Sequence, residues 1–542
     1  MRDIACLRKS IAAIVAGLAT CAVLTPVYAA SAPSTATPIK HLVVIFQENV
    51  SFDHYFATYP VAKNPGDEPE FLALPDTPTV NGFSGALLFN NPNAHNWRNG
   101  KGGTNPFRLG RNQAATADQD HDYTAEQMAF DHGLMDAFPF SVGTADTPAE
   151  APEGPSILLT TGLTMGYYDG NTVTAFWNYA QHYAMNDNSF GTNFGPSTDG
   201  AINLISGQTN GVIDDVNSGG STISDGNGGL TLISDADPIG DVCSTTTGET
   251  LRFGGKNVGD LLTAAGVTWG FFQGGFNLTT VNANGTTGCK RSTTSTVTKT
   301  LKADYIPHHQ PFQYYVSTAN LTHARPKSVA LIGHNGDGAN HQYDTQDFFD
   351  AVSAGNFPAV SYLKAPGFQD GHAGYSDPLD EQTFVVDVIN FLQKQADWSS
   401  TAVVIAYDDS DGWYDHVIGP IVNQSATAAD MLSGTGLCGG GFGALAGVNP
   451  ATQHAQGRCG YGPRLPLLVI SPWARKNFVD HTMTDQSSIL RFVEDNWLAG
   501  KRLGEGSFDT IAGPINHMFN FIDGAPDNTG RLFLNPSTGE KQ

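Results

Sequence analysis

Short runs of apolar and β-branched residues without charge recur along the chain and predict buried strands. The clearest run is Thr401–Ala406, which is followed after Tyr407 by Asp408 and Asp409. Such runs are typical of strands in a parallel sheet that is covered on both faces. The predicted strands are His41–Phe46, Val267–Phe272, Val329–Ile332, Ala359–Leu363, Thr401–Ala406 and Leu465–Ile470.

Segments with the helical spacing of apolar residues separate these runs. Strands that alternate with helices indicate an α/β fold, in which a mostly parallel sheet is sandwiched by helices. The predicted helices are Gln127–Phe138, Phe176–Ala184, Leu261–Ala265, Glu381–Ala396 and Ser488–Trp497.

Gly-rich stretches interrupt this alternation without forming a repeat. Residues 208–256 are almost all Gly, Ser, Thr, Asn and Asp and predict a β-rich or irregular lobe, and residues 418–462 form a second Gly-rich insertion. Residues 60–118 are rich in Pro, Asn and Gly and predict a surface loop. We expect one large domain with inserted lobes, arranged as a spacer over 31–40, the domain over 41–525 and a tail over 526–542.

Composition is typical of a loop-rich secreted globule. Only 15% of the 542 residues are charged, while Gly (61) and Pro (30) are plentiful. The formal net charge of −24 argues against binding to nucleic acid or to an anionic membrane through bulk electrostatics. It does not exclude an anionic substrate, because a local cation can reverse the field inside a cleft.

The first 30 residues have the pattern of a signal peptide. Arg2, Arg8 and Lys9 form a positive start, Ile11–Leu24 is an apolar core, and Val27–Ala29 offers a small-residue cleavage site. The apolar run is short for a membrane span, and no second span follows. We therefore expect a protein without a transmembrane anchor that is exported, to the periplasm or beyond.

Four cysteines remain after the signal peptide: Cys243, Cys289, Cys438 and Cys459. An even number in an oxidising compartment favours disulfides, and no CxxC spacing suggests zinc. Four cysteines allow three connectivities. We favour Cys243–Cys289 with Cys438–Cys459, because each bond would staple one Gly-rich excursion.

Two predicted strands end in possible metal ligands. Glu48 and Asn49 follow the first strand, and Asp408 and Asp409 follow Thr401–Ala406. Ligand sites of open α/β sheets lie beyond the carboxyl ends of the strands. Oxygen ligands suit one hard divalent cation such as calcium, magnesium or manganese. The alternatives are an acidic loop that caps the next element and a helix cap at Asn49.

A Gly/Pro turn offers a candidate nucleophile. Ser197 lies in such a turn just before the apolar run Ala201–Ile205, so a helix could begin there with its amides directed at an anion. The alternative is an ordinary Ser-Thr cap. Ser189 and Thr198 are rival hydroxyls.

Four histidines in polar loops suggest a phosphate or other anion site. They are His121, His308, His309 and His372. An imidazolium can donate hydrogen bonds to phosphate and can protonate a leaving group. A second group is interpreted as structural, and His481 has no clear role; the structural group is His334, Asp337, His341 and Asp344.

The motifs in this order resemble those of the bacterial phosphoesterase family, which includes phospholipases C and acid phosphatases. The resemblance rests on His41–Phe56, Tyr407–Val417, Arg464–Arg475 and Ser488–Glu494, and it extends from His41 to Trp497. It implies an alkaline-phosphatase-like core. It also implies that Ser197 is both nucleophile and metal ligand, beside Glu48, Asn49, Asp408 and Asp409. His121, His308, His309 and His372 would surround the phosphoryl group.

One departure from the family pattern separates its branches. The phospholipases C carry a Thr nucleophile in Gly-Pro-Thr-x-Pro-Asn-Arg, whereas this chain has Ser197 in Gly195–Ala201 and lacks the Pro-Asn-Arg. That resembles the acid phosphatases, so we expect phosphomonoester hydrolysis through a phosphoserine. Phospholipase C activity on phosphodiesters such as phosphatidylcholine is the alternative. A sulfatase would need a Cys/Ser-x-Pro-x-Arg motif, which is not found in the candidate segments. An exported binding protein with a structural cation is the most distant alternative.

Overall fold

A computed structural model of the protein describes residues 34–143, 156–439, 456–522 and 524–542. The predicted signal peptide therefore lies outside the described residues. Within the described part of the chain, no helix is both long enough and apolar enough to cross a bilayer.

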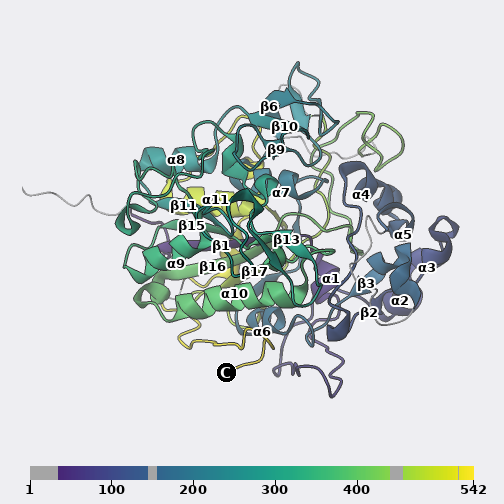
Figure 1. Cartoon of the computed structure of the whole chain (residues 1–542). Helices are drawn as coiled ribbons and strands as arrows, with labels where there is room; N and C mark the ends of the chain where they lie inside the picture. The colour runs from purple at the N-terminus through teal and green to yellow at the C-terminus, as the bar shows by residue number, and fades with distance from the viewer. Residues whose placement is uncertain (1–33, 144–155, 440–455, 523) are drawn as a thin grey trace, which may run out of the picture. The chain divides into compact units, whose positions relative to one another are not determined.

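An eight-stranded sheet forms the centre of the fold (Figure 1). Its strand order is β14-β11-β15-β1-β16-β17-β4-β18, and every pair is parallel except the two that β17 makes with β16 and β4. The predicted mostly parallel sheet is thus confirmed. The strands are β1 (His41–Gln47), β4 (Ala184–Asn186), β11 (Trp269–Gln273), β14 (Gln342–Asp344), β15 (Val360–Lys364), β16 (Thr401–Tyr407), β17 (Leu467–Ile470) and β18 (Phe478–Asp480).

Helices cover both faces of this sheet, as Figure 1 shows. One layer contains α7 (Ser197–Ser206), α8 (Val258–Ala265) and α11 (Ser487–Trp497). The other contains α6 (Thr174–His182), α9 (Thr345–Ser353) and α10 (Pro378–Gln393). All seven residues of β16 are buried between the layers, which explains why its sequence has no charge.

Two smaller groups of elements flank the sheet. The first is a five-stranded sheet of β6 (Asn210–Val216), β7 (Thr222–Ser224), β8 (Leu230–Leu232), β9 (Asp237–Pro238) and β10 (Thr250–Phe253), in the segment where a β-rich lobe was expected. The second is a helical lobe of α2 (Gly85–Phe89), α3 (Pro92–His95), α4 (Tyr123–Phe130) and α5 (Phe138–Ser141), near α1 (Phe52–Phe56) (Figure 1). The two-stranded pairs are β2 (Phe107–Arg108) with β3 (Gly166–Tyr167), β5 (Ser189–Phe190) with β19 (Thr484–Asp485), and β12 (Ser292–Thr294) with β13 (Leu301–Ala303).

Three local predictions were wrong. Val329–Ile332 is not a strand: Val329–Leu331 is a 3-10 turn with exposed Val and Leu side chains, because a run of four apolar residues carries too little periodicity to identify a strand. The helix predicted at Gln127–Phe138 ends at Phe130, since Asp131 and His132 adopt positive φ angles of 39° and 58° that break it. Residues 60–118 are not all loop, because they contain α2 and α3.

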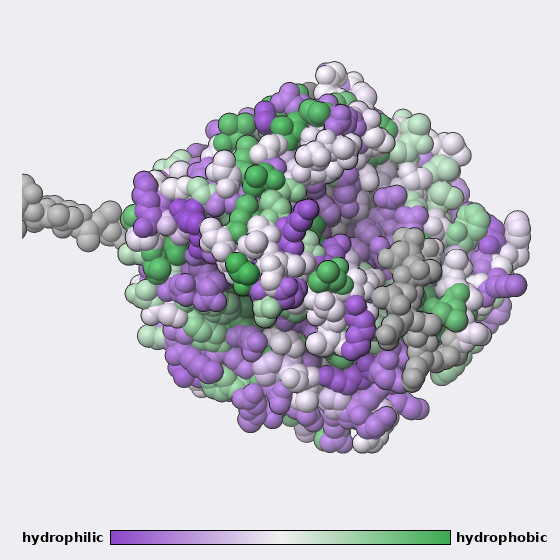
Figure 2. Space-filling view, in the orientation of Figure 1, coloured by the Kyte–Doolittle hydropathy of each residue, from purple (hydrophilic) through white to green (hydrophobic). Residues whose placement is uncertain are grey.

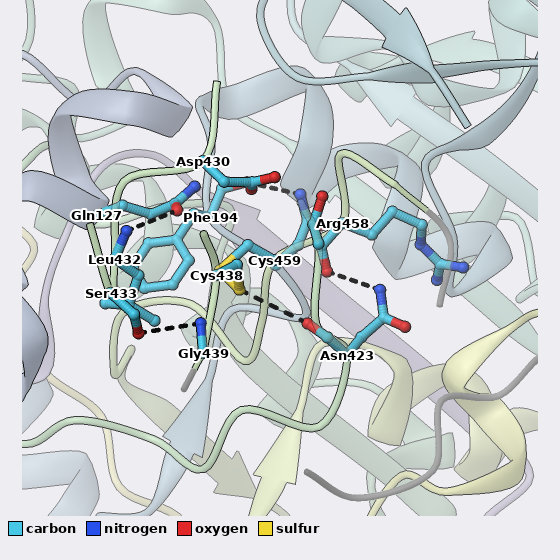
Figure 3. Close-up of a disulfide and its surroundings, with 12 residues drawn as sticks. Gln127, Phe194, Asn423, Asp430, Leu432, Ser433, Cys438, Gly439, Arg458 and Cys459 are labelled. Carbon is cyan, nitrogen blue, oxygen red and sulfur yellow. Dashed lines mark hydrogen bonds between the residues drawn. A yellow bond between two sulfur atoms is a disulfide. The ribbon is translucent and has the colours of Figure 1, made fainter. Parts of the chain in front are cut away.

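Both predicted disulfides, Cys243–Cys289 and Cys438–Cys459, are formed. Figure 3 shows the second one with its surroundings. The backbone N–H of Phe194, three residues before Ser197, donates to the carbonyl oxygen of Cys459 at 2.9 Å. The side chain of Gln127 in α4 accepts from the amide of Leu432 at 3.2 Å. The described residues around this disulfide therefore contact both α4 and the segment that leads to Ser197.

Candidate active site

The pairing of β1 with β16 brings two acidic strand ends together. The strands are in register from His41 opposite Thr401 to Gln47 opposite Tyr407, so the next residues, Glu48 and Asp408, leave the sheet side by side. Asn49 then turns the chain with a φ of 63°, which Asn tolerates better than most residues, and its backbone N–H donates to Oδ1 of Asp408 at 3.0 Å.

Three carboxylates converge at this edge of the sheet. Glu48, Asp408 and Asp409 each offer an oxygen within 4.8 Å of the others, and all three are buried. Burial, followed by repulsion from Asp408, raises the pKa of Glu48 to about 8. Burial is also the main cause that raises the pKa of Asp408 to about 6 and that of Asp409 to about 7. A cluster of this kind is stable in its ionised form only when cations face it.

Ser197 lies within this carboxylate cluster. It is the first residue of α7, and its Oγ donates to Oε2 of Glu48 at 2.8 Å, with Oδ2 of Asp409 at 3.2 Å. The amide oxygen of Asn49 is 3.4 Å away. Gly200 allows this approach, because a Cβ there would lie 2.1 Å from the carbonyl oxygen of Asp408.

The two rival hydroxyls lie elsewhere. The hydroxyl of Thr198 donates to Oδ1 of Asp235 at 2.6 Å. Ser189 belongs to β5, which pairs with β19. Of the three candidates, the structure brings only Ser197 to the carboxylates.

The four predicted histidines lie around the same cluster. Nδ1 of His309 is 3.1 Å from Oε1 of Glu48, and the rings of His308 and His309 are 4.5 Å apart. On the other side, Nε2 of His121 is 3.4 Å from the amide nitrogen of Asn49, and the ring of His372 is 5.7 Å from that of His121. The structure therefore brings together all nine residues expected at the site.

The histidines differ in their electrostatic surroundings. Burial lowers the pKa of His121, but Asp409, Asp118 and Asp411 outweigh it, so that the pKa is raised well above its usual value. The pKa of His308 is likewise raised against burial, by Asp235 and Asp237. Burial and neighbouring cationic groups instead lower the pKa of His309 and of His372. The site thus contains two histidines that favour the imidazolium and two that favour the neutral ring.

Lys364 is a site residue that the sequence analysis missed. It ends β15, the other neighbour of β1, and its Nζ contacts Oε1 of Glu48 and lies 3.4 Å from Oδ2 of Asp408. The side chain is buried and offsets part of the negative charge of the cluster. The sequence did contain a signal for this residue, because Lys364 directly follows the predicted strand Ala359–Leu363.

Two further acidic residues hold the site in place from outside. Glu126 of α4 accepts from Oγ of Ser410 at 2.6 Å and from the backbone N–H of Gly195 at 3.1 Å. Asp411 accepts from the amide nitrogen of Asn49 at 2.9 Å and lies 3.6 Å from Nδ1 of His121. Both residues fix the loops that carry Ser197 and Asn49, and neither was singled out from the sequence.

Three other polar residues singled out from the sequence make structural contacts instead. His341 is buried and stacks on Trp269 at 4.4 Å, with Nδ1 2.9 Å from the Trp269 carbonyl oxygen. Asp344 caps α9 and pairs with Arg291 at 3.1 Å. His481 is exposed and pairs with Asp187 at 2.7 Å.

Comparison with known proteins gives one family and several named relatives. A model of the phosphoesterase family matches residues 39–499. The chain is 24% identical over 503 residues to a non-hemolytic phospholipase C of Pseudomonas aeruginosa, which covers 90% of this chain and 58% of the relative. It is 26% identical over 474 residues to a non-hemolytic phospholipase C of Burkholderia pseudomallei, covering 85% of this chain and 55% of the relative. It is 22% identical over 521 residues to phospholipase C A of Mycobacterium tuberculosis, covering 92% of this chain and 80% of the relative.

The chain thus spans little more than half the length of the first two relatives. A solved structure from Vibrio parahaemolyticus, described as a protein in the alkaline phosphatase superfamily, matches 60% of each chain at 13% identity with a TM-score of 0.25. That score is too low to add to the fold assignment, which rests on the sheet itself.

Proposed function

This chain belongs to the phosphoesterase family, and we propose that it hydrolyses phosphoric ester bonds with Ser197 as its nucleophile. The observation that carries the proposal is the position of the Ser197 hydroxyl, 2.8 Å from Glu48 and 3.2 Å from Asp409, at the first residue of α7. A hydroxyl that donates to buried carboxylates can lose its proton in the direction of those groups.

We further propose a phosphodiester substrate of the phospholipase C type. The support comes from the relatives, which are named phospholipases C. Their names favour this alternative over the acid phosphatase that the sequence around Ser197 led us to expect. The acid phosphatase stays as the second candidate, because Ser197 and the missing Pro-Asn-Arg depart from the phospholipase pattern.

The donor set fits a divalent cation. Glu48, Asp408 and Asp409 supply carboxylate oxygens, Asn49 supplies an amide oxygen, and Ser197 supplies a hydroxyl, all of which are hard ligands. The three carboxylates carry three negative charges against one from Lys364, which leaves a deficit that one divalent ion would balance. When bound, such an ion would supply positive charge against the Ser197 oxygen and the phosphoryl oxygens.

The residues of the chain support a two-step phosphoryl transfer. In the first step the Ser197 oxygen forms a bond to phosphorus while its proton moves toward the carboxylates, and the bond to the leaving oxygen breaks. A histidine gives that oxygen its proton. In the second step water attacks the phosphoserine, phosphate or a phosphomonoester leaves, and Ser197 regains a proton.

Of the candidates His308, His309 and His372, only His308 has surroundings that favour the imidazolium, so we propose it as the proton donor. It lies 3.5 Å from Asp237 and 3.9 Å from Asp235, which favour its imidazolium form. His372 is less suited, because its Nδ1 lies 2.7 Å from the Ala373 carbonyl oxygen, as in a neutral ring that donates there and leaves Nε2 as an acceptor.

Two further proposals concern export and the domain boundaries. We propose that the mature protein is exported, to the periplasm or beyond; the two disulfides are typical of an oxidising compartment. We also propose that residues 41–525 form one phosphoesterase domain with insertions at 208–256 and 418–462.

Hydrolysis of two chromogenic esters tests the proposed function. p-Nitrophenylphosphorylcholine and p-nitrophenyl phosphate are compared for the wild type, Ser197→Ala and the control Ser206→Ala, which makes the same change in the same helix. We expect faster turnover of the diester, loss of turnover in Ser197→Ala and retention in Ser206→Ala. Preference for the monoester would identify the acid phosphatase, and full activity of Ser197→Ala would disprove its role as nucleophile.

A further inference from the structure

The helical lobe beside the active site exposes large apolar side chains. Trp97 is 88% exposed and Phe89 is 79% exposed, and these two residues flank α3. Leu134 and Phe140 are also exposed. Isolated exposed apolar residues are ordinary, but aromatic residues gathered on one lobe mark an interaction surface.

Hydrogen bonds connect the elements that carry these exposed side chains. The side chain of Asn93 donates to the Met135 carbonyl oxygen at 2.8 Å, and that of Asn96 donates to the Asp136 carbonyl oxygen at 3.2 Å. The guanidinium group of Arg98 lies 4.3 Å from the centre of the Phe140 ring. We call Phe89, Trp97, Leu134 and Phe140, together with Arg98 and Lys101, the aromatic surface. Apolar side chains are visible on this side of the molecule in Figure 2.

Residues 77–117, the part of the chain that carries Phe89, Trp97, Arg98 and Lys101, have a basic composition. Between Thr77 and Ala117 the sequence contains no Asp or Glu, whereas the whole chain carries a formal charge of −24. Arg98 pairs with Asp131 at 3.2 Å, and Lys101 is exposed. Exposed Trp and Phe beside an exposed Lys are side chains that bind at the interface of a phospholipid bilayer, where the rings enter the headgroup region and the cation meets phosphate.

The aromatic surface belongs to the same lobe as one wall of the active site. α4 begins two residues after His121 and carries Glu126, which accepts hydrogen bonds from Ser410 and Gly195. Ser141 in α5, next to Phe140, donates through its hydroxyl to the Ala125 carbonyl oxygen of α4 at 2.6 Å. The lobe that carries the aromatic surface therefore also carries one wall of the active site.

We propose that the aromatic surface docks the protein on a zwitterionic phospholipid bilayer, from which the substrate is drawn. This inference rests on the proposed phospholipase C function, because a soluble phosphomonoester would need no such surface. A zwitterionic bilayer fits better than an anionic one, since the large negative net charge opposes approach to an anionic membrane.

Binding of the full chain to phosphatidylcholine vesicles tests the proposal. Co-sedimentation is measured for the wild type, for a Trp97→Ser, Phe140→Ser double variant, and for Val316→Ser as a control at an exposed position outside the helical lobe. We expect the double variant to bind vesicles about tenfold more weakly than the wild type. The control should bind like the wild type, and all three proteins should hydrolyse p-nitrophenylphosphorylcholine equally. Equal binding of all three proteins, or no binding of the wild type, would overturn the proposal.

Fluorescence quenching locates the contact independently. Trp97 is the one mostly exposed tryptophan of the described chain, so brominated phosphatidylcholine should quench the wild type and not Trp97→Phe. Equal quenching of both would place the contact elsewhere and overturn the proposal.

Two outcomes separate this proposal from the proposed function. Hydrolysis of monomeric short-chain phosphatidylcholine without vesicle binding would keep the function and reject the surface. Vesicle binding through Trp97 without hydrolysis of any phosphatidylcholine would keep the surface and reject the function. A wild-type dimer that the double variant loses, with no vesicle binding, would identify a protein interface instead and overturn the proposal.

Discussion

Ser197 and Glu48 are 149 positions apart in the chain, yet the Ser197 hydroxyl donates to Oε2 of Glu48 at 2.8 Å. Glu48 is fixed by the end of β1, and Ser197 is fixed by the start of α7. The contact therefore depends on how closely the helix approaches the sheet edge. Gly200 allows the close approach of the helix. Lys364 sets part of the charge at the sheet edge.

Gly200→Ala should displace the start of α7. The new Cβ would lie 2.1 Å from the carbonyl oxygen of Asp408, so either the helix or the Asp408 backbone must move. We expect a loss of stability on the order of 1–3 kcal/mol and a loss of turnover that is larger than unfolding alone explains. Gly66→Ala, where no atom lies within 4 Å of the added Cβ, should change neither property. Equal turnover of both folded variants would show that α7 tolerates the shift.

Lys364→Met should make the protein dependent on a divalent cation for stability. Without Lys364, the buried Glu48 and Asp408 repel each other with less compensation, and removal of one partner of a buried ion pair costs about 3–5 kcal/mol. Urea unfolding in chelator should reveal this loss, and added calcium, magnesium or manganese should restore part of it. The exposed Lys394→Met serves as the control. An identical loss with and without metal would argue against a cation at the carboxylates.

The stability of the protein should fall even when Arg464 is replaced by Lys. Its guanidinium group donates to Oδ2 of Asp415 at 3.1 Å and to Oδ1 of Asp53 at 2.9 Å, entirely buried. Lys lacks the planar fork that serves both carboxylates, so Arg464→Lys should lose several kcal/mol, on the order of a broken buried pair. Exposed Arg531→Lys should stay within about 0.5 kcal/mol of the wild type. Urea midpoints check both, and a mild effect at Arg464 would mean that Asp53 and Asp415 find other partners.

His54 should contribute to instability in acid. Its ring is buried against Trp413 at 3.9 Å, and burial lowers its pKa to about 3. The unfolded chain has a His pKa near 6.5, so between these values the unfolded state binds the extra proton. Stability should fall as the pH is lowered below about 6.5, by up to about 1.4 kcal/mol per pH unit from this group.

Comparison of His54→Phe with the wild type isolates that contribution. The variant should lose some stability at neutral pH, because the hydrogen bond to the Gly166 carbonyl is removed, but its stability should fall less steeply between pH 6 and 4. Urea unfolding at several pH values gives both slopes. Parallel pH profiles would show that His54 does not take part.

Much of the sheet could be predicted because buried parallel strands have charge-free sequences. β1 and β16 are apolar between their first and last residues, and the residues after them had to meet if the strands were neighbours. The run at Val329 has the same composition but lies at the surface, so composition alone failed there.

The rest of the site could not be predicted because it depends on contacts between distant loops. Glu126 lies directly before the segment predicted as a helix, where a carboxylate is ordinary, and only the fold places it against Gly195. Lys364 was detectable, since it follows a predicted strand, but a single Lys at a strand end is commonly exposed.

Trapping of a phosphorylated intermediate tests directly whether Ser197 is the nucleophile. The wild type and Ser206→Ala are mixed with a phosphoester substrate, quenched in acid and digested, and the peptide that contains Ser197 is examined by mass spectrometry. We expect phosphate or its monoester on Ser197 in both proteins, and no such modification in Ser197→Ala. Phosphorylation at another residue, or turnover by Ser197→Ala, would contradict it.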